Sequence, residues 1–147
     1  IKVYLFFSQN FIDFISIPNQ NIHRIRGEEE PLSESIRYGR EIMDHMTLRH
    51  GENLFDWVLL GVGIDGHTAS LFPMHETSIS SKKICEEVRH PQTEQKRITM
   101  TPFALRQSTN ITYHVIGEEK STCIDVKDKS PKPVLILVRF SVICAPL

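Results

Sequence analysis

The stretch that decides the fold is VLLGVGIDGHTASLFP, residues 58–73. It begins with a continuous apolar run, which is typical of a strand buried on both faces of a parallel sheet. Three glycines with the spacing G-x-G-x-x-G follow, and Asp65 and His67 lie in the same turn. The pattern allows two interpretations: a dinucleotide-binding turn, or a turn that presents His67 for chemistry.

Dinucleotide binding requires more than this glycine spacing. The third glycine of such a motif opens a long helix whose N-terminus points at a pyrophosphate. Here Pro73 lies only seven positions after Gly66, and proline stops a helix because it lacks a donor and clashes with the preceding turn. Glu86 favours the cofactor interpretation, since it lies near the place of a ribose-binding acid, about 20 residues on. We nevertheless expect the glycines to serve a different turn.

The second interpretation places His67 at the rim of a ligand site. Ligands of open parallel sheets collect beyond the carboxyl ends of the strands, and glycines let the backbone turn tightly and approach them. A histidine there can take a proton from water at neutral pH, with Asp65 two residues earlier to orient it. On the local pattern alone, His67 could equally serve only to hydrogen-bond the loop.

The rest of the chain alternates between short strands and short helices. Strands are predicted at residues 1–7, 58–63, 84–88, 97–101 and 111–116, and helices at 33–50, 102–108 and 118 to about 126. This alternation predicts an α/β fold with an open, mostly parallel sheet flanked by helices, in a single domain over residues 1–147.

Composition narrows the class of protein. The formal net charge is −1, so nothing in the overall charge favours binding to nucleic acid or to an anionic membrane. The three cysteines have no CxxC spacing, which argues against a disulfide framework or a zinc ribbon and suits the cytoplasm. We expect no signal peptide, and the apolar stretch 134–146 is too short for a membrane helix.

Several segments together resemble one family. GVGIDGHTASLFP, residues 61–73, is similar to the signature of the 6-phosphogluconolactonase family, within the wider glucosamine-6-phosphate isomerase-like group. Segments 8–28, 90–101 and 115–120 agree with the family in the same order. The related deaminases carry a sequence like DGHIAFNEP, whose Glu takes part in ring opening. Ser70-Leu71-Phe72-Pro73 stands in that place here, which favours the lactonase over a deaminase-like isomerase.

The resemblance implies a NagB/RpiA-like, Rossmann-type fold and hydrolysis of 6-phospho-D-glucono-1,5-lactone to 6-phosphogluconate. It implies that His67 is the base, and that Asp65 orients either His67 or the hydroxyls of the substrate. Backbone groups at Gly63 and Gly66 would approach the substrate and its oxyanion, and Lys120 would bind the phosphate. Arg97 begins a predicted strand, from which it could reach the phosphate or pair with an acid. The resemblance implies no metal or organic cofactor and, as partner, only the sugar-phosphate substrate.

Two family motifs are absent from the 147 residues: a Gly-Gly-x-x-Pro phosphate loop and an Asp-Glu-Arg motif, which the resemblance places in a preceding N-terminal segment. Residues 129–147 also diverge from the family's usual close. The alternative function is therefore a non-catalytic remnant that binds a sugar phosphate. Surface or structural positions are expected for the remaining six histidines, which are His23, His45, His50, His75, His90 and His114.

Overall fold

The computed structural model describes residues 2–49, 53–73 and 81–123. Its α-helices are α1 (Lys2–Asn10), α2 (Pro31–Arg49) and α3 (Pro102–Arg106), and its strands are β1 (Val58–Gly61), β2 (Cys85–Arg89), β3 (Lys96–Met100) and β4 (Ile111–His114). Short 3-10 helices cover Ile12–Phe14, Asn19–Asn21 and Glu118–Cys123, the last labelled η4. The α/β class predicted from the sequence is confirmed. The divergent tail 129–147 lies outside the described residues.

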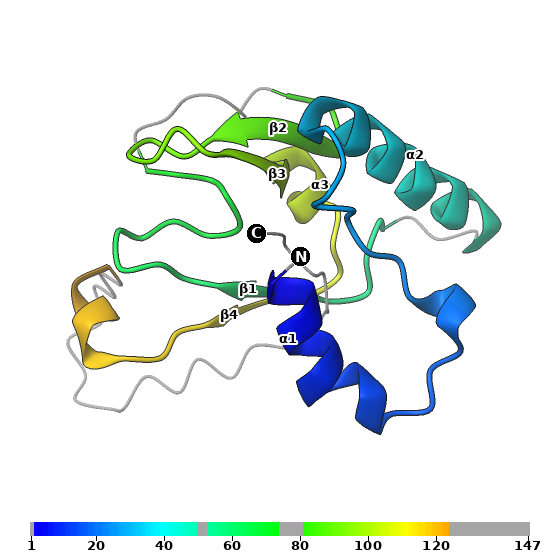
Figure 1. The fold of residues 1–147 in the computed structure, drawn as a ribbon, viewed down its shortest axis with the longest axis horizontal. Coiled ribbons are helices and arrows are strands. Elements are labelled where there is room, and N and C mark those ends of the chain that lie inside the picture. The colour runs from blue at the N-terminus through cyan, green and yellow to red at the C-terminus, as the bar shows by residue number, and fades with distance from the viewer. Residues whose placement is uncertain (1, 50–52, 74–80, 124–147) are drawn as a thin grey trace.

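The strands form two pairs of opposite kind (Figure 1). β1 and β4 are parallel, with Val58 opposite Ile111 and Gly61 opposite His114. β2 and β3 form an antiparallel hairpin. The parallel pairing predicted for the strand before the glycine turn is therefore present. Because β1 and β4 run in the same direction, the segments that follow them leave at the same edge.

α1 corrects the prediction of a strand at residues 1–7. A short apolar run does not distinguish a buried strand from a helix by its periodicity. The helical spacing brings the rings of Phe7 and Phe11 together, with centroids 5.1 Å apart, and the backbone N–H of Phe11 donates to the carbonyl of Phe7. This contact between residues four apart is available only to the helix.

α2 occupies nearly the predicted range, and a carboxylate caps its first turn. The carboxylate of Glu30, and not the hydroxyl of Ser33, accepts the first free amides, from Leu32 at 3.1 Å and Ser33 at 2.8 Å. These hydrogen bonds lower the pKa of Glu30 below its ordinary value. Pro31 stands at the first helical position, where its missing donor costs nothing.

The core lies between α2, the hairpin and the parallel pair (Figure 1). Its buried members are Ile25, Tyr38, Ile42, Leu54, Val58, Leu60, Cys85, Ile98, Met100, Ala104 and Leu105. α3 begins at Pro102 as predicted, and the Thr101 hydroxyl caps it by accepting from the amide of Ala104. Trp57 stays at the edge of the core, where its Nε1–H donates to Thr112 at 3.0 Å. Within the described residues, no helix is both long and apolar enough to span a bilayer.

Candidate functional site

The loop from Val62 to Pro73 leaves β1 as a sequence of tight turns. The amide of Gly63 donates to the carbonyl of His67 at 2.8 Å, and the amide of Gly66 donates to the carbonyl of Gly63 at 3.1 Å. Gly66 has a φ of 81°, a left-handed conformation that glycine adopts without strain. No helix begins between residues 66 and 73. The helix that a dinucleotide site requires is therefore missing from this stretch.

His67 and Asp65 form a hydrogen-bonded pair inside this loop. Nδ1 of His67 lies 2.5 Å from Oδ1 of Asp65, and the backbone amide of His67 donates to the same oxygen at 3.2 Å. Partial burial raises the pKa of Asp65, but the hydrogen bonds from His67 outweigh it, so the net pKa lies below the ordinary value. Since an ionised carboxylate only accepts, Nδ1 carries the proton and Nε2 carries the lone pair. The His67 side chain is 27% exposed, so this lone pair is suited to act on a ligand.

Gly63 makes room for this pair. A Cβ at position 63 would lie 2.3 Å from Nδ1 and Cε1 of His67 and 2.7 Å from Oδ1 of Asp65. These separations are too short for any side chain to be tolerated without movement of the imidazole or the carboxylate. The glycine at this position is therefore a steric requirement of the pair.

The far end of the loop is fastened to the hairpin. The backbone amide of Ser70 donates to the buried Oγ1 of Thr99 in β3 at 3.1 Å. Thr68 closes the turn, because its hydroxyl donates to the carbonyl of Gly61 at 2.9 Å. Ala69 between them has a φ of 51°, which is uncommon for a residue with a side chain.

The two predicted phosphate residues come from different elements. Lys120 lies in η4, which follows β4, while the His67 loop follows β1, so the parallel pairing brings both segments to one edge (Figure 1). Arg97 lies in β3, two residues before Thr99, so both side chains leave the same face of the strand. The buried Nε of Arg97 has no hydrogen-bond partner among the described residues.

Glu86, the predicted ribose acid of the dinucleotide interpretation, has other partners. Its carboxylate accepts from the hydroxyl of Ser81 and lies 4.0 Å from Nζ of Lys83. These contacts join Glu86 to the residues directly before β2.

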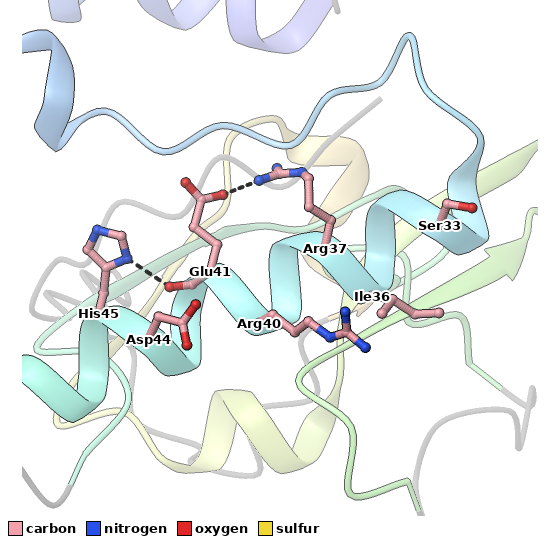
Figure 2. A pocket seen from close by; sticks show the side chains of 7 residues that line it. All are labelled: Ser33, Ile36, Arg37, Arg40, Glu41, Asp44 and His45. Carbon is pink, nitrogen blue, oxygen red and sulfur yellow. Dashed lines mark hydrogen bonds and ion pairs between the residues drawn. The ribbon is translucent and has the colours of Figure 1, made fainter.

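A separate groove runs along α2 (Figure 2). Its lining residues are Ser33, Ile36, Arg37, Arg40, Glu41, Asp44 and His45. Glu41 joins two of them, since its carboxylate pairs with Arg37 and its backbone carbonyl lies 2.7 Å from Nδ1 of His45. None of the predicted site residues lines this groove.

No role at the site was predicted for three residues of this region, and one of them, His90, was expected at a surface or structural position. The ring of Phe72 packs against the imidazole at a tilt, the ring of His90 meets that of Phe72 edge to face, and Thr99 fastens the loop. Phe72 and His90 both lie inside segments that carry the family resemblance. Each precedes a proline, and a ring in such a place is equally expected for a residue that only packs in the core.

A family model described as glucosamine-6-phosphate isomerases/6-phosphogluconolactonase matches residues 2–134. The chain belongs to this family. It is 43% identical over 119 residues to a protein of Haemophilus influenzae named 6-phosphogluconolactonase, a match that covers 81% of this chain and 49% of the relative. It is 39% identical over 100 residues to the protein of that name from Treponema pallidum, covering 67% of this chain and 41% of the relative.

Solved structures agree with this membership. The crystal structure of a protein named devB superposes with a TM-score of 0.68 at 37% identity and covers 78% of this chain and 48% of that one. The 6-phosphogluconolactonase from Trypanosoma cruzi, at 22% identity and a TM-score of 0.51, shares the fold. The chain spans about half the length of the curated relatives that it matches.

Proposed function

We propose that this family member hydrolyses 6-phospho-D-glucono-1,5-lactone to 6-phosphogluconate in the pentose phosphate pathway. The observation that carries the proposal is the pair of His67 and Asp65 at the carboxyl edge of β1. Its relatives named 6-phosphogluconolactonase support the choice of substrate. We assign the reaction to the cytoplasm because the cysteine pattern suits a reducing compartment.

His67 acts as the general base in this proposal. Its Nε2 lone pair takes a proton from a water molecule, and the water oxygen bonds to the lactone carbonyl carbon. The tetrahedral intermediate then collapses, and the bond from this carbon to the ring oxygen breaks. The imidazolium returns its proton to the ring oxygen, which leaves as the sugar hydroxyl. Asp65 holds the imidazole in the tautomer that this sequence requires and stabilises the imidazolium.

The phosphate of the substrate is assigned to Lys120 and Arg97. Lys120 supplies a point charge from the segment that follows β4, which leaves the parallel pair at the same edge as the His67 loop. The buried Nε of Arg97 supports its assignment, because a guanidinium N–H without a partner costs free energy that an anionic ligand would recover.

Gly63 and Gly66 enter the proposal as residues that let the loop approach the substrate. Their amides already donate to carbonyls within the turn. We therefore replace the role of oxyanion donors, expected from the sequence, with this steric role.

An assay of lactone hydrolysis tests the proposal. We expect the purified chain to consume the lactone faster than its spontaneous hydrolysis, and His67→Ala to remove this excess rate. His45→Ala is the matched control, because His45 lies exposed on α2, where its ring bonds the backbone carbonyl of Glu41. A wild-type rate equal to the background would refute catalysis by this chain.

Binding of a sugar phosphate without turnover is the second candidate. It is supported by the buried Nε of Arg97, which has no hydrogen-bond partner among the described residues and suits an anionic ligand whether or not that ligand is turned over. In that case 6-phosphogluconate raises the melting temperature of a chain that shows no excess hydrolysis. Lys120→Ala should remove this shift, whereas Lys82→Ala, an exposed lysine before β2, should keep it.

A further inference from the structure

We infer that Phe72 and His90 are positioning residues that fix the orientation of the His67 imidazole. The inference rests on the proposed function for its catalytic meaning. The ring centroids of His67 and Phe72 are 5.0 Å apart, with the planes tilted by 43°. The rings of Phe72 and His90 are 4.8 Å apart and meet edge to face at 72°. The three rings therefore form a continuous series from the loop to the hairpin.

His90 is held firmly at the far end of this series. Its Nδ1 accepts from the backbone amides of Gln92 at 3.2 Å and Thr93 at 3.3 Å, and its own amide donates to the carbonyl of Gln95 at 2.9 Å. Because Nδ1 accepts, the proton of the neutral ring is on Nε2. The ring cannot turn without breaking the bonds that shape the loop between β2 and β3.

Phe72 is held by its own loop. Its side chain is buried, with 8% of the residue exposed. The preceding residues form a tight turn in which the amide of Leu71 donates to the carbonyl of Thr68 at 2.8 Å, and the amide of Ser70 is bonded to Thr99. Phe72 therefore lies against His67 from one side while His90 limits its movement on the other.

The contact with Phe72 supplies a constraint that Asp65 does not. The hydrogen bond from Nδ1 to Asp65 fixes one atom of the imidazole but leaves the ring free to tilt about that atom. An aromatic neighbour against the ring restricts the tilt, because aromatic pairs prefer offset or edge-to-face geometries. The two contacts together set the direction of Nε2. A general base must point at the proton it takes, so this direction bears on the rate.

The nitrogen chemical shifts of His67 test the inference without any need for turnover. We expect the wild-type imidazole to show the shifts of a single tautomer with the proton on Nδ1. Phe72→Leu should move both shifts toward the average of the two tautomers, because a ring that is free to tilt leaves the geometry in which Nδ1–H donates to Asp65. Phe55→Leu is the matched control, since Phe55 packs against the core before β1, at the end of that strand away from His67. Wild-type shifts in Phe72→Leu would overturn the inference.

Two substitutions at His90 separate its ring from its hydrogen bonds. His90→Phe keeps a ring against Phe72 but loses the acceptor for the loop amides. His90→Asn keeps an acceptor but loses the ring. We expect His90→Phe to retain the wild-type shifts of His67 and His90→Asn to lose them. The opposite result would show that loop capping, not ring contact, governs His67, and would overturn the inference.

Kinetics distinguish this inference from the proposed function. If the wild-type chain is a lactonase, Phe72→Leu should lower kcat about 10-fold and leave KM within a factor of about two, because the substrate contacts remain. An unchanged kcat in that variant would overturn the inference. If the wild-type chain shows no turnover, the proposed function fails, while the shifts of His67 still decide whether Phe72 and His90 position its ring.

Discussion

Oδ1 of Asp65 accepts two hydrogen bonds from His67, one from the imidazole at 2.5 Å and one from the backbone amide at 3.2 Å. A single oxygen thus fixes both the tautomer of the ring and the turn that carries it. An asparagine at this position could present an amide nitrogen in place of that oxygen, which would favour the wrong tautomer. We expect Asp65→Asn to lower kcat for the lactone by about 10²-fold, measured against Asp44→Asn on the exposed face of α2.

The acid sensitivity of this pair follows from the direction of the Asp65 pKa. The folded pKa lies below the ordinary value because the hydrogen bonds from His67 outweigh partial burial. The pair therefore stabilises the fold fully above the unfolded pKa of about 3.9, and this contribution is lost as the pH falls through the lower folded pKa. Unfolding in urea should show a wild-type advantage over Asp65→Asn at pH 6 that disappears below the folded pKa. An advantage that persists in strong acid would contradict this.

Gly63 and Gly61 provide a matched pair of substitutions. A Cβ at Gly63 meets the ring of His67 and the carboxylate of Asp65, whereas a Cβ at Gly61 meets no atom within 4 Å. We expect Gly63→Ala to displace the imidazole, with a loss of about 1–3 kcal/mol in the free energy of unfolding, and to abolish the single-tautomer shifts of His67. Gly61→Ala should leave both unchanged. Equal effects of the two substitutions would refute the steric role of Gly63.

Arg37 neutralises a carboxylate buried under α2. The Glu34 side chain is 1% exposed and accepts from Nε of Arg37 at 2.5 Å and from the amide of Arg26 at 2.7 Å. Arg37→Met leaves this charge buried without its cation, which should lower the free energy of unfolding by roughly 3 kcal/mol. Arg40→Met, on the exposed side of the same helix, is the control. Chemical denaturation measures both, and a loss under about 1 kcal/mol for Arg37→Met would count against the buried pair.

Local sequence signals were sufficient for most elements of the fold. The helix over α2 and the strands β1, β2, β3 and β4 were predicted within a few residues, since each has a clear period or a bounding glycine or proline. The prediction of a strand at residues 1–7 was wrong. A short apolar run suits either a strand or a helix, and the contact with Phe11 that favours the helix is not evident from the run alone. The cap at Glu30 was not predicted, because three consecutive glutamates before Pro31 are more typical of a solvated turn than of a helix cap.

The candidate site was predictable only in part. The spacing placed Asp65 and His67 in one turn, and their contact needs no distant residue. The bond from Ser70 to Thr99 and the rings of Phe72 and His90 depend on how the hairpin packs on the loop, which no local pattern records. The catalytic and phosphate-binding roles assigned to these and the other predicted residues remain predictions.

The parallel pairing of β1 with β4 has a consequence for the order of assembly. Trp57, directly before β1, donates a hydrogen bond to Thr112 of β4, and the two residues are 55 positions apart in the chain. During synthesis the turn with His67 therefore leaves the ribosome well before the strand that completes its edge. Pairing of strands that are distant in the chain is slower than formation of a helix or a hairpin, because the loop-closure entropy is lost before the strands make contacts. We expect the hairpin to form early and the arrangement around His67 to be completed among the last steps of folding.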